Sequence, residues 1–239
     1  MPRHTFVLIA GAWHGAWCWE KITPLLEAQG HRVVTPELPA TGGDTSDAAG
    51  VTLESWARFV ADAIARESDA VMLVGHSRGG IVISRTAELV PERVKRLVYV
   101  SAYLLPAGST LAGSARADAE SLVPPNMIPA ASGITCTLRP EVIRPALFGQ
   151  CTDADVDYAM TRLTPEPLKP LVTPLKVTAD RFGAVPRTYI ECLQDRTVTL
   201  PAQRRMQADL PCDPVLQLDS DHSPFLSHPQ ELARLLGGL

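Results

Sequence analysis

The chain alternates between short apolar runs and segments in which apolar residues recur at helical spacing. The run at residues 6–9 lacks the two-residue alternation of a half-exposed strand, so it predicts a strand buried on both faces. The other predicted strands cover residues 31–35, 70–74, 96–101, 188–193 and 215–218. Helices are predicted over residues 19–29, 53–64, 81–90 and 201–208, and a last helix is predicted after a capping-box motif at 227–230. Strands that alternate with helices predict a mostly parallel, six-stranded α/β sheet with helices on both faces.

The helical pattern is clearest in the predicted second helix. Thr52, a typical N-cap residue, precedes it, and its apolar positions are Leu53, Trp56, Ala57, Val60 and Ile64.

The alternation of strands and helices stops after Tyr103. Prolines crowd residues 106–182, and only residues 153–163 have a convincing helical pattern. Apolar residues are nevertheless too frequent there for disorder. We therefore predict a core formed by residues 1–105 and 183–239, with residues 106–182 inserted as a cap of short helices over the carboxyl edge of the sheet.

A glycine-rich turn joins the predicted strand 70–74 to the helix that follows it. The turn reads Gly75-x-Ser77-x-Gly79, which is the strand–turn–helix context of a nucleophile elbow. Such a turn forces the serine into a strained backbone conformation, holds its hydroxyl at the top of the sheet and points a helix N-terminus at the reacting atom. A plain glycine-rich turn is the alternative interpretation.

Two further residues complete a candidate catalytic triad with Ser77. Asp195 and His222 each follow a predicted strand, and the order Ser, Asp, His is that of α/β-hydrolases. In this interpretation His222 is the general base, and Asp195 orients its ring and stabilises the imidazolium. Competing carboxylates are Asp180, Asp213, Asp219 and Asp221; the last two lie too close in sequence to His222 to approach its far nitrogen easily.

An oxyanion hole is expected from two backbone amides. The N–H of Arg78, the residue after the nucleophile, is one donor, and the loop after the first strand supplies the other, most plausibly from Ala12. Gly11 and Ala12 lack bulk, so a substrate can approach the backbone closely. We expect a pocket between the sheet edge and the cap, lined by aliphatic residues together with Gly11, Trp13, Tyr103 and Phe148.

Composition narrows the function classes. The 239 residues carry a net charge of −4 with no basic cluster, which argues against nucleic acid or an anionic membrane as partner. No signal peptide and no apolar run long enough to span a bilayer is recognisable. The five cysteines form no C-x-x-C pair and no residues show metal-ligand spacing. We expect a cytoplasmic protein that needs no metal or cofactor.

Several motifs resemble one branch of the α/β-hydrolases, which holds plant methylesterases, hydroxynitrile lyases and bacterial EstC-like esterases, the last being the most similar. The motifs are residues 10–19 (AGAWHGAWCW), 30–33 (GHRV), 75–80 (GHSRGG), 181–190 (RFGAVPRTYI), 194–195 (QD) and 221–226 (DHSPFL). The resemblance implies the triad and the oxyanion amides named above. It also implies that His14, Tyr103 and Ser223 face the substrate.

The chain departs from this branch at two places. Members usually carry His-Gly where this chain has Ala10 and Gly11, so a hydrogen bond that stiffens the oxyanion loop is expected to be missing. Arg78 replaces a common apolar residue, and its side chain is expected either to alter the pocket wall or to pair with an acid. The lyases resemble esterases with Thr or Asn in place of Gly11, one type also having Lys in place of Ser223, which favours the esterase interpretation here.

The sequence therefore predicts a serine carboxylic-ester hydrolase for small to medium apolar or aromatic esters, acting through an acyl-enzyme. The alternatives are a non-catalytic small-molecule receptor on the same fold and a C–C hydrolase or lyase step in a biosynthetic pathway. The expected partner is a small-molecule ester. Whether the chain is a monomer or a homodimer stays open.

Overall fold

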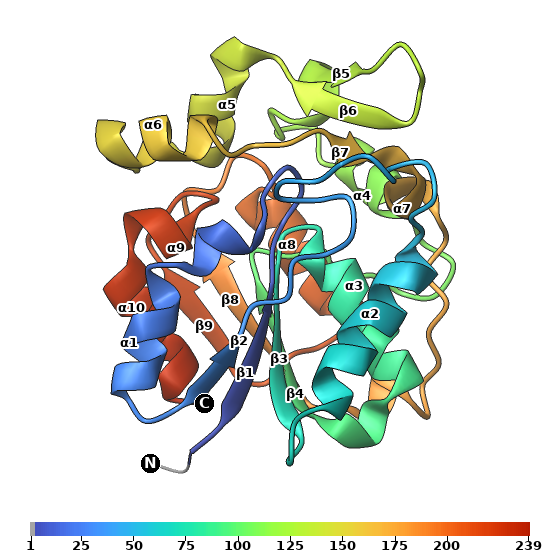
Figure 1. The fold of residues 1–239 in the computed structure, drawn as a ribbon, viewed down its shortest axis with the longest axis vertical. Coiled ribbons are helices and arrows are strands. Elements are labelled where there is room, and N and C mark those ends of the chain that lie inside the picture. Colours follow the sequence, from blue (N-terminus) through green and yellow to red (C-terminus); the bar gives the residue numbers. More distant parts are fainter. Residues whose placement is uncertain (1–2) are drawn as a thin grey trace.

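A single parallel sheet forms the centre of the molecule (Figure 1). The computed structural model describes residues 3–239, so residues 1–2 of the predicted core lie outside the description. The strand order is β2-β1-β3-β4-β8-β9, and each neighbouring pair is parallel. The strands are β1 (Thr5–Ile9), β2 (Arg32–Val34), β3 (Val71–His76), β4 (Val94–Val100), β8 (Arg187–Cys192) and β9 (Val215–Leu218). The predicted six-stranded α/β sheet is confirmed.

Helices cover both faces of this sheet and enclose two apolar cores (Figure 1). Alternate residues of β1 separate the cores: Phe6 and Leu8 face one, Val7 and Ile9 the other. The first core is covered by η1 (Ala16–Trp19), α1 (Ile22–Ala28), α9 (Pro224–Ser227) and α10 (Pro229–Gly237). The second is covered by α2 (Leu53–Ala65), α3 (Gly79–Leu89), α8 (Leu200–Asp209) and η4 (Phe182–Ala184), while η2 (Pro91–Arg93) leads into β4.

The two predicted helix starts have different outcomes. Thr52 caps α2 as predicted, since its side chain accepts a hydrogen bond from the N–H of Ser55 in a capping box. The capping box predicted at residues 227–230 is wrong. His228 occupies the N-cap position of α10 without a side-chain cap, because the Ser227 hydroxyl instead donates to Asp221 at 2.7 Å.

Most of the segment 106–182 lies across the carboxyl ends of the strands, at the top of Figure 1. Its last residues, 173–182, do not belong to this layer: they run down beside α3, where Thr178 and Arg181 bond to Glu88 near the C-terminal end of that helix. The segment contains the helical pieces α4 (Leu111–Arg116), η3 (Pro124–Asn126), α5 (Pro140–Leu147), α6 (Asp153–Met160) and α7 (Leu168–Val172). It also contains an antiparallel sheet that the sequence analysis did not predict, made of β5 (Met127–Pro129), β6 (Thr135–Leu138) and β7 (Glu166–Pro167). Strands of two to four residues are too short to show a periodic pattern. Within residues 3–239, no helix is long and apolar enough to cross a membrane.

Candidate active site

Ser77 occupies the strained turn that the sequence predicts. Its φ of 51° lies in the left-handed region, which residues other than glycine rarely adopt. The turn leaves no room for side chains beside it: a Cβ on Gly75 would lie 2.8 Å from the Gly79 backbone, and one on Gly79 would lie 2.7 Å from the Ile9 carbonyl oxygen. The glycines therefore permit the close packing of β3, the turn and α3 that presents the serine hydroxyl.

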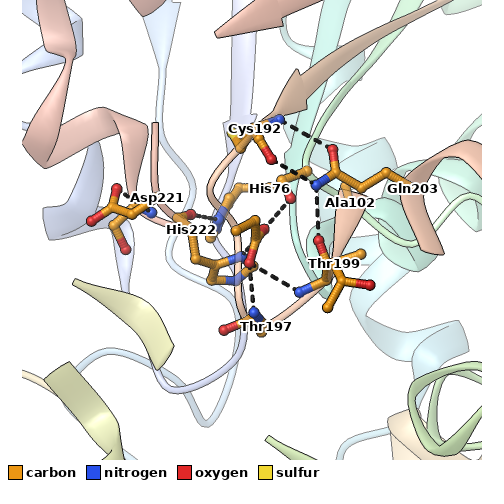
Figure 2. Close-up of polar contacts among 12 residues, drawn as sticks. His76, Ala102, Cys192, Thr197, Thr199, Gln203, Asp221 and His222 are labelled. Carbon is orange, nitrogen blue, oxygen red and sulfur yellow. Dashed lines mark hydrogen bonds and ion pairs between the residues drawn. The ribbon is translucent and has the colours of Figure 1, made fainter. Parts of the chain in front are cut away.

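Asp195 and His222 form a direct pair at the ends of β8 and β9. Asp195 Oδ2 lies 2.6 Å from His222 Nδ1 and also accepts from the Ser101 hydroxyl. Its Oδ1 accepts from the N–H groups of Thr197 at 2.6 Å and Val198 at 3.0 Å (Figure 2). A carboxylate on Nδ1 requires that nitrogen to carry the proton, which leaves Nε2 of His222 as the acceptor.

The competing carboxylates beside His222 are engaged elsewhere. Asp221 accepts from the N–H of Gln150 at 2.8 Å and from two nearby serines, and it fixes the turn rather than the ring. Asp219 is exposed and accepts from the Gln194 side chain at 2.9 Å. Of the residues that the structure describes, Asp195 alone holds the His222 ring by a side-chain hydrogen bond.

His76, the residue before the nucleophile, sets the position of His222. Its Nε2 donates to the His222 carbonyl oxygen at 2.7 Å, and the two ring centroids lie 4.6 Å apart (Figure 2). Burial lowers the pKa of His76 well below its usual value, so the ring stays neutral. Ser77 and His222 make no direct hydrogen bond within residues 3–239; in free enzymes such bonds often tighten only when substrate binds.

The predicted oxyanion loop lies directly against the nucleophile. A Cβ on Gly11 would be 2.9 Å from Ser77 Cβ, so the glycine permits this approach. Ala12 and Arg78 both line the cavity beside Ser77. The Arg78 side chain does not form a free pocket wall: it is 1% exposed, and its Nε lies 3.0 Å from Glu166 Oε1 of β7. Of the two expectations for this side chain, pairing with an acid is therefore the one observed.

An apolar cavity of about 190 Å³ lies between Ser77 and the cap. Trp13 and Tyr103 line it as predicted, and burial raises the pKa of the Tyr103 hydroxyl. The cap contributes most of the remaining lining, which the sequence analysis did not identify because these segments have no periodic pattern. These cap residues are Leu111, Ala112, Ala115, Arg116, Val123, Pro124, Met127, Leu168, Leu171 and Val172.

Four residues predicted to contact the substrate are not among those that line this cavity, so their contact with substrate stays a prediction. They are Gly11, His14, Phe148 and Ser223. The orientation of His14 is fixed by its Nδ1, which donates to the Ala12 carbonyl oxygen at 2.7 Å. Its ring packs edge-on against Phe148 and Phe225, so His14 and Phe148 belong to the buried core behind the oxyanion loop. Ser223 is fully buried at the start of α9.

A serine on a strained strand–helix turn, with an Asp–His pair at the ends of later parallel strands under an inserted cap, defines an α/β-hydrolase. Comparison with known proteins agrees. Residues 6–235 match the alpha/beta hydrolase family, and the chain belongs to that family.

Similar proteins include plant and bacterial members. The chain is 31% identical to Methylesterase 7 of Arabidopsis thaliana over 244 residues, which covers 97% of this chain and 94% of that protein. Among solved structures, the methylesterase MES16 from Arabidopsis is 26% identical, with a TM-score of 0.84 over 98% of this chain and 97% of that one. A pyrethroid hydrolase from Sphingobium faniae is 30% identical, with a TM-score of 0.83 over 99% and 97%. The resemblance to the plant methylesterase branch is confirmed; the particular closeness to EstC-like esterases stays a prediction.

Proposed function

We propose that the protein is a serine carboxylic-ester hydrolase that acts on small to medium apolar or aromatic esters through an acyl-enzyme. The observation that carries this proposal is the Asp195–His222 pair, joined at 2.6 Å, beside a strained serine that opens into an apolar cavity. The similarity to methylesterases, to a pyrethroid hydrolase and to polyneuridine aldehyde esterase supports it.

The proposed reaction runs in two halves. Ser77 Oγ attacks the ester carbonyl carbon while His222 Nε2 takes its proton, and Asp195 stabilises the imidazolium that forms. The N–H groups of Ala12 and Arg78 receive the developing oxyanion. Collapse of the tetrahedral intermediate breaks the bond to the alcohol, which leaves with the proton from His222. Water then attacks the acyl-serine with His222 as base, releasing the acid and restoring Ser77.

The cavity supports apolar esters as the substrate class. Its lining is predominantly aliphatic and aromatic, and its volume of about 190 Å³ suits an acyl or alcohol group of modest size. The charged residues that line it are Arg78, whose side chain is paired with Glu166, and Arg116, which is exposed on α4. The hydrogen bond between Asp195 and His222 supports an enzyme over a non-catalytic receptor.

The proposal also covers the cap, the cellular location and the oligomeric state of the protein. Residues 106–172 form one inserted cap whose side chains select the substrate. All five cysteines are free thiols, which supports a reducing, cytoplasmic location. The homodimer stays an untested prediction.

A panel of esters tests the proposed activity. Wild type and Ser77→Ala are assayed with p-nitrophenyl acetate and with methyl, ethyl and aryl esters, and Ser132→Ala, an exposed serine in the cap, serves as matched control. We expect turnover by wild type and by the control, and loss to the background rate in Ser77→Ala. Activity retained by Ser77→Ala would contradict nucleophilic catalysis at this residue. No turnover of any ester by wild type would favour the receptor interpretation.

A further inference from the structure

A buried ion pair joins three segments that meet at the proposed oxyanion hole. Arg78 follows the nucleophile, Glu166 comes from β7 of the cap, and each side chain is 1% exposed. Besides facing Glu166, Arg78 donates from Nη2 to the carbonyl oxygen of Gly11 at 2.8 Å. Glu166 Oε2 in turn accepts from the N–H of Trp13 at 3.0 Å. The pair thus holds the backbone on both sides of Ala12, which lines the cavity beside Ser77.

Because the peptide bond is planar, the contact that holds the Gly11 carbonyl also sets the orientation of the Ala12 amide. The carbonyl of Gly11 and the N–H of Ala12 belong to one trans peptide unit and point in opposite directions. When Arg78 holds the Gly11 oxygen, it therefore fixes the direction of the Ala12 N–H. A cationic donor on the carbonyl also polarises the peptide and strengthens its N–H as a donor. Within residues 3–239, neither Ala12 nor Arg78 uses its N–H for a hydrogen bond to another protein group.

The next peptide unit is held at both ends as well. Its carbonyl, on Ala12, accepts from His14 Nδ1 at 2.7 Å, and its N–H, on Trp13, donates to Glu166. Trp13 has a φ of 63°, an unfavourable conformation for a tryptophan that persists only where surrounding contacts impose it. The contact with Glu166 is one of those contacts. Trp13 is also held by the N–H of Thr164, which donates to its carbonyl oxygen at 3.0 Å, and by the Cys136 carbonyl oxygen, which accepts from its Nε1 at 3.1 Å. Of these contacts, the one with Glu166 acts on the same peptide unit as the Ala12 carbonyl, so its loss affects the Ala12 peptide most directly.

We propose that Arg78 and Glu166 are positioning residues, whose ion pair orients the Ala12 amide toward the transition-state oxyanion and links that orientation to the cap. The inference rests on the proposed function. A buried ion pair adds little to the free energy of unfolding, because the cost of desolvating two charges offsets much of their attraction. The Arg78 guanidinium also lies 4.5 Å from the centre of the Trp56 ring, which limits the motion of the side chain. We therefore infer that the ion pair serves to position the backbone rather than to stabilise the fold.

Four variants separate positioning from stability. Arg78→Lys keeps the charge but lacks the fork that reaches Gly11 and Glu166 together. Glu166→Gln keeps one acceptor but sets an amide N–H₂ against either the Trp13 N–H or the Arg78 guanidinium. The double variant Arg78→Met with Glu166→Met removes both charges and leaves no unpaired ion. Arg85→Met, which removes the ion pair between Arg85 and Glu54 on the surface of α2 and α3, is the matched control.

Each variant is assayed for kcat and KM per active site, with active sites counted by a fluorophosphonate that reacts with the serine. An aryl trifluoromethyl ketone reports transition-state binding, thermal unfolding reports stability, and turnover by wild type establishes the underlying activity. Removing one oxyanion donor typically lowers kcat by about 10²- to 10³-fold, so a misdirected donor is expected to cost roughly 10- to 100-fold. We expect that loss in the double variant, smaller losses in Arg78→Lys and Glu166→Gln, and none in Arg85→Met.

Two further readouts distinguish this role from a structural one. KM is expected to stay close to that of wild type, while affinity for the trifluoromethyl ketone falls by the same factor as kcat/KM. A kcat per titrated site equal to that of wild type in Arg78→Lys, Glu166→Gln and the double variant would overturn the inference, whatever happens to the unfolding temperature. That result would leave the proposed function intact, whereas retained activity in Ser77→Ala would remove the basis of both.

Discussion

Exchanging one carboxylate oxygen of Asp195 for an amide tests the role of this residue in detail. In Asp195→Asn, two orientations of the amide are available. With the N–H₂ toward Thr197 and Val198, the amide group faces the two backbone N–H donors that bind Asp195 Oδ1 at 2.6 and 3.0 Å in the wild-type protein. With the N–H₂ toward His222, it faces one donor, and the Ser101 hydroxyl can turn to accept from it. The second orientation is therefore favoured.

That orientation reverses the tautomer of the catalytic histidine. His222 Nδ1 must accept from the amide, so its proton moves to Nε2, which can no longer take the proton of Ser77. The corresponding change in a Ser-His-Asp protease lowers kcat by about 10⁴-fold, which is about 5 kcal/mol of transition-state stabilisation. We expect a loss of that order in ester turnover at neutral pH, with a folded fraction close to that of wild type because the side chain keeps its size.

The assay compares kcat of wild type, Asp195→Asn and Asp219→Asn, with circular dichroism as a check on folding. Asp219 is the matched control because it lies near His222 in sequence, is exposed and, among the described residues, makes a side-chain hydrogen bond only with Gln194. If Asp195→Asn retained a kcat within about tenfold of wild type, or if Asp219→Asn lost as much, the assignment of Asp195 would be refuted.

Three further outcomes are expected. Burial lowers the pKa of His14 to about 3 from 6.5, so the unfolded state takes this proton first as the pH falls, and the contribution of His14 to folding stability decreases by about 1.4 kcal/mol per pH unit between pH 6.5 and 3. Urea unfolding of His14→Asn, which keeps a donor for Ala12, should show a shallower pH dependence, and an unchanged slope would contradict this. Gly11→Ala places a Cβ 2.9 Å from Ser77 Cβ, so kcat should fall by roughly 100-fold or more while the Gly43→Ala control, with open space around it, keeps its activity; equal activity would contradict the close approach. Thr52→Ala should lower the free energy of unfolding by about 1 kcal/mol without changing kcat, and no loss of stability would show that the cap of α2 contributes nothing.

The sequence contains enough information for the sheet and for the order of the catalytic groups. A strand that is apolar on both faces, such as residues 71–74, is stable only when helices cover both faces of its sheet. Parallel strands bring their carboxyl ends to the same edge of the sheet. Ser77, Asp195 and His222 each follow a strand of this parallel sheet, so their convergence follows from topology. The glycines at 75 and 79 likewise follow from the backbone contacts that the turn requires.

The side chains that surround the pocket cannot be predicted from the sequence in the same way. The strands β5 to β7 are too short and too rich in proline to predict, yet they place Met127 at the cavity and Glu166 under Arg78. An acid that pairs with Arg78 is one of two expectations from the sequence. That this acid is Glu166 depends on how the cap folds, because Glu166 lies 88 positions after Arg78 in the chain. The orientation of the His14 ring also could not be predicted from sequence, because it depends on a hydrogen bond to the Ala12 carbonyl oxygen.

The covalent intermediate provides the most direct test of the mechanism. Wild type and His222→Gln are mixed with p-nitrophenyl acetate, quenched in acid during turnover, digested and examined by mass spectrometry. The mechanism predicts one acetyl group on Ser77 in the wild-type digest and a much slower appearance of that group in His222→Gln. An acetyl group on another residue, or turnover in wild type with Ser77 unmodified at every quench time, would contradict it.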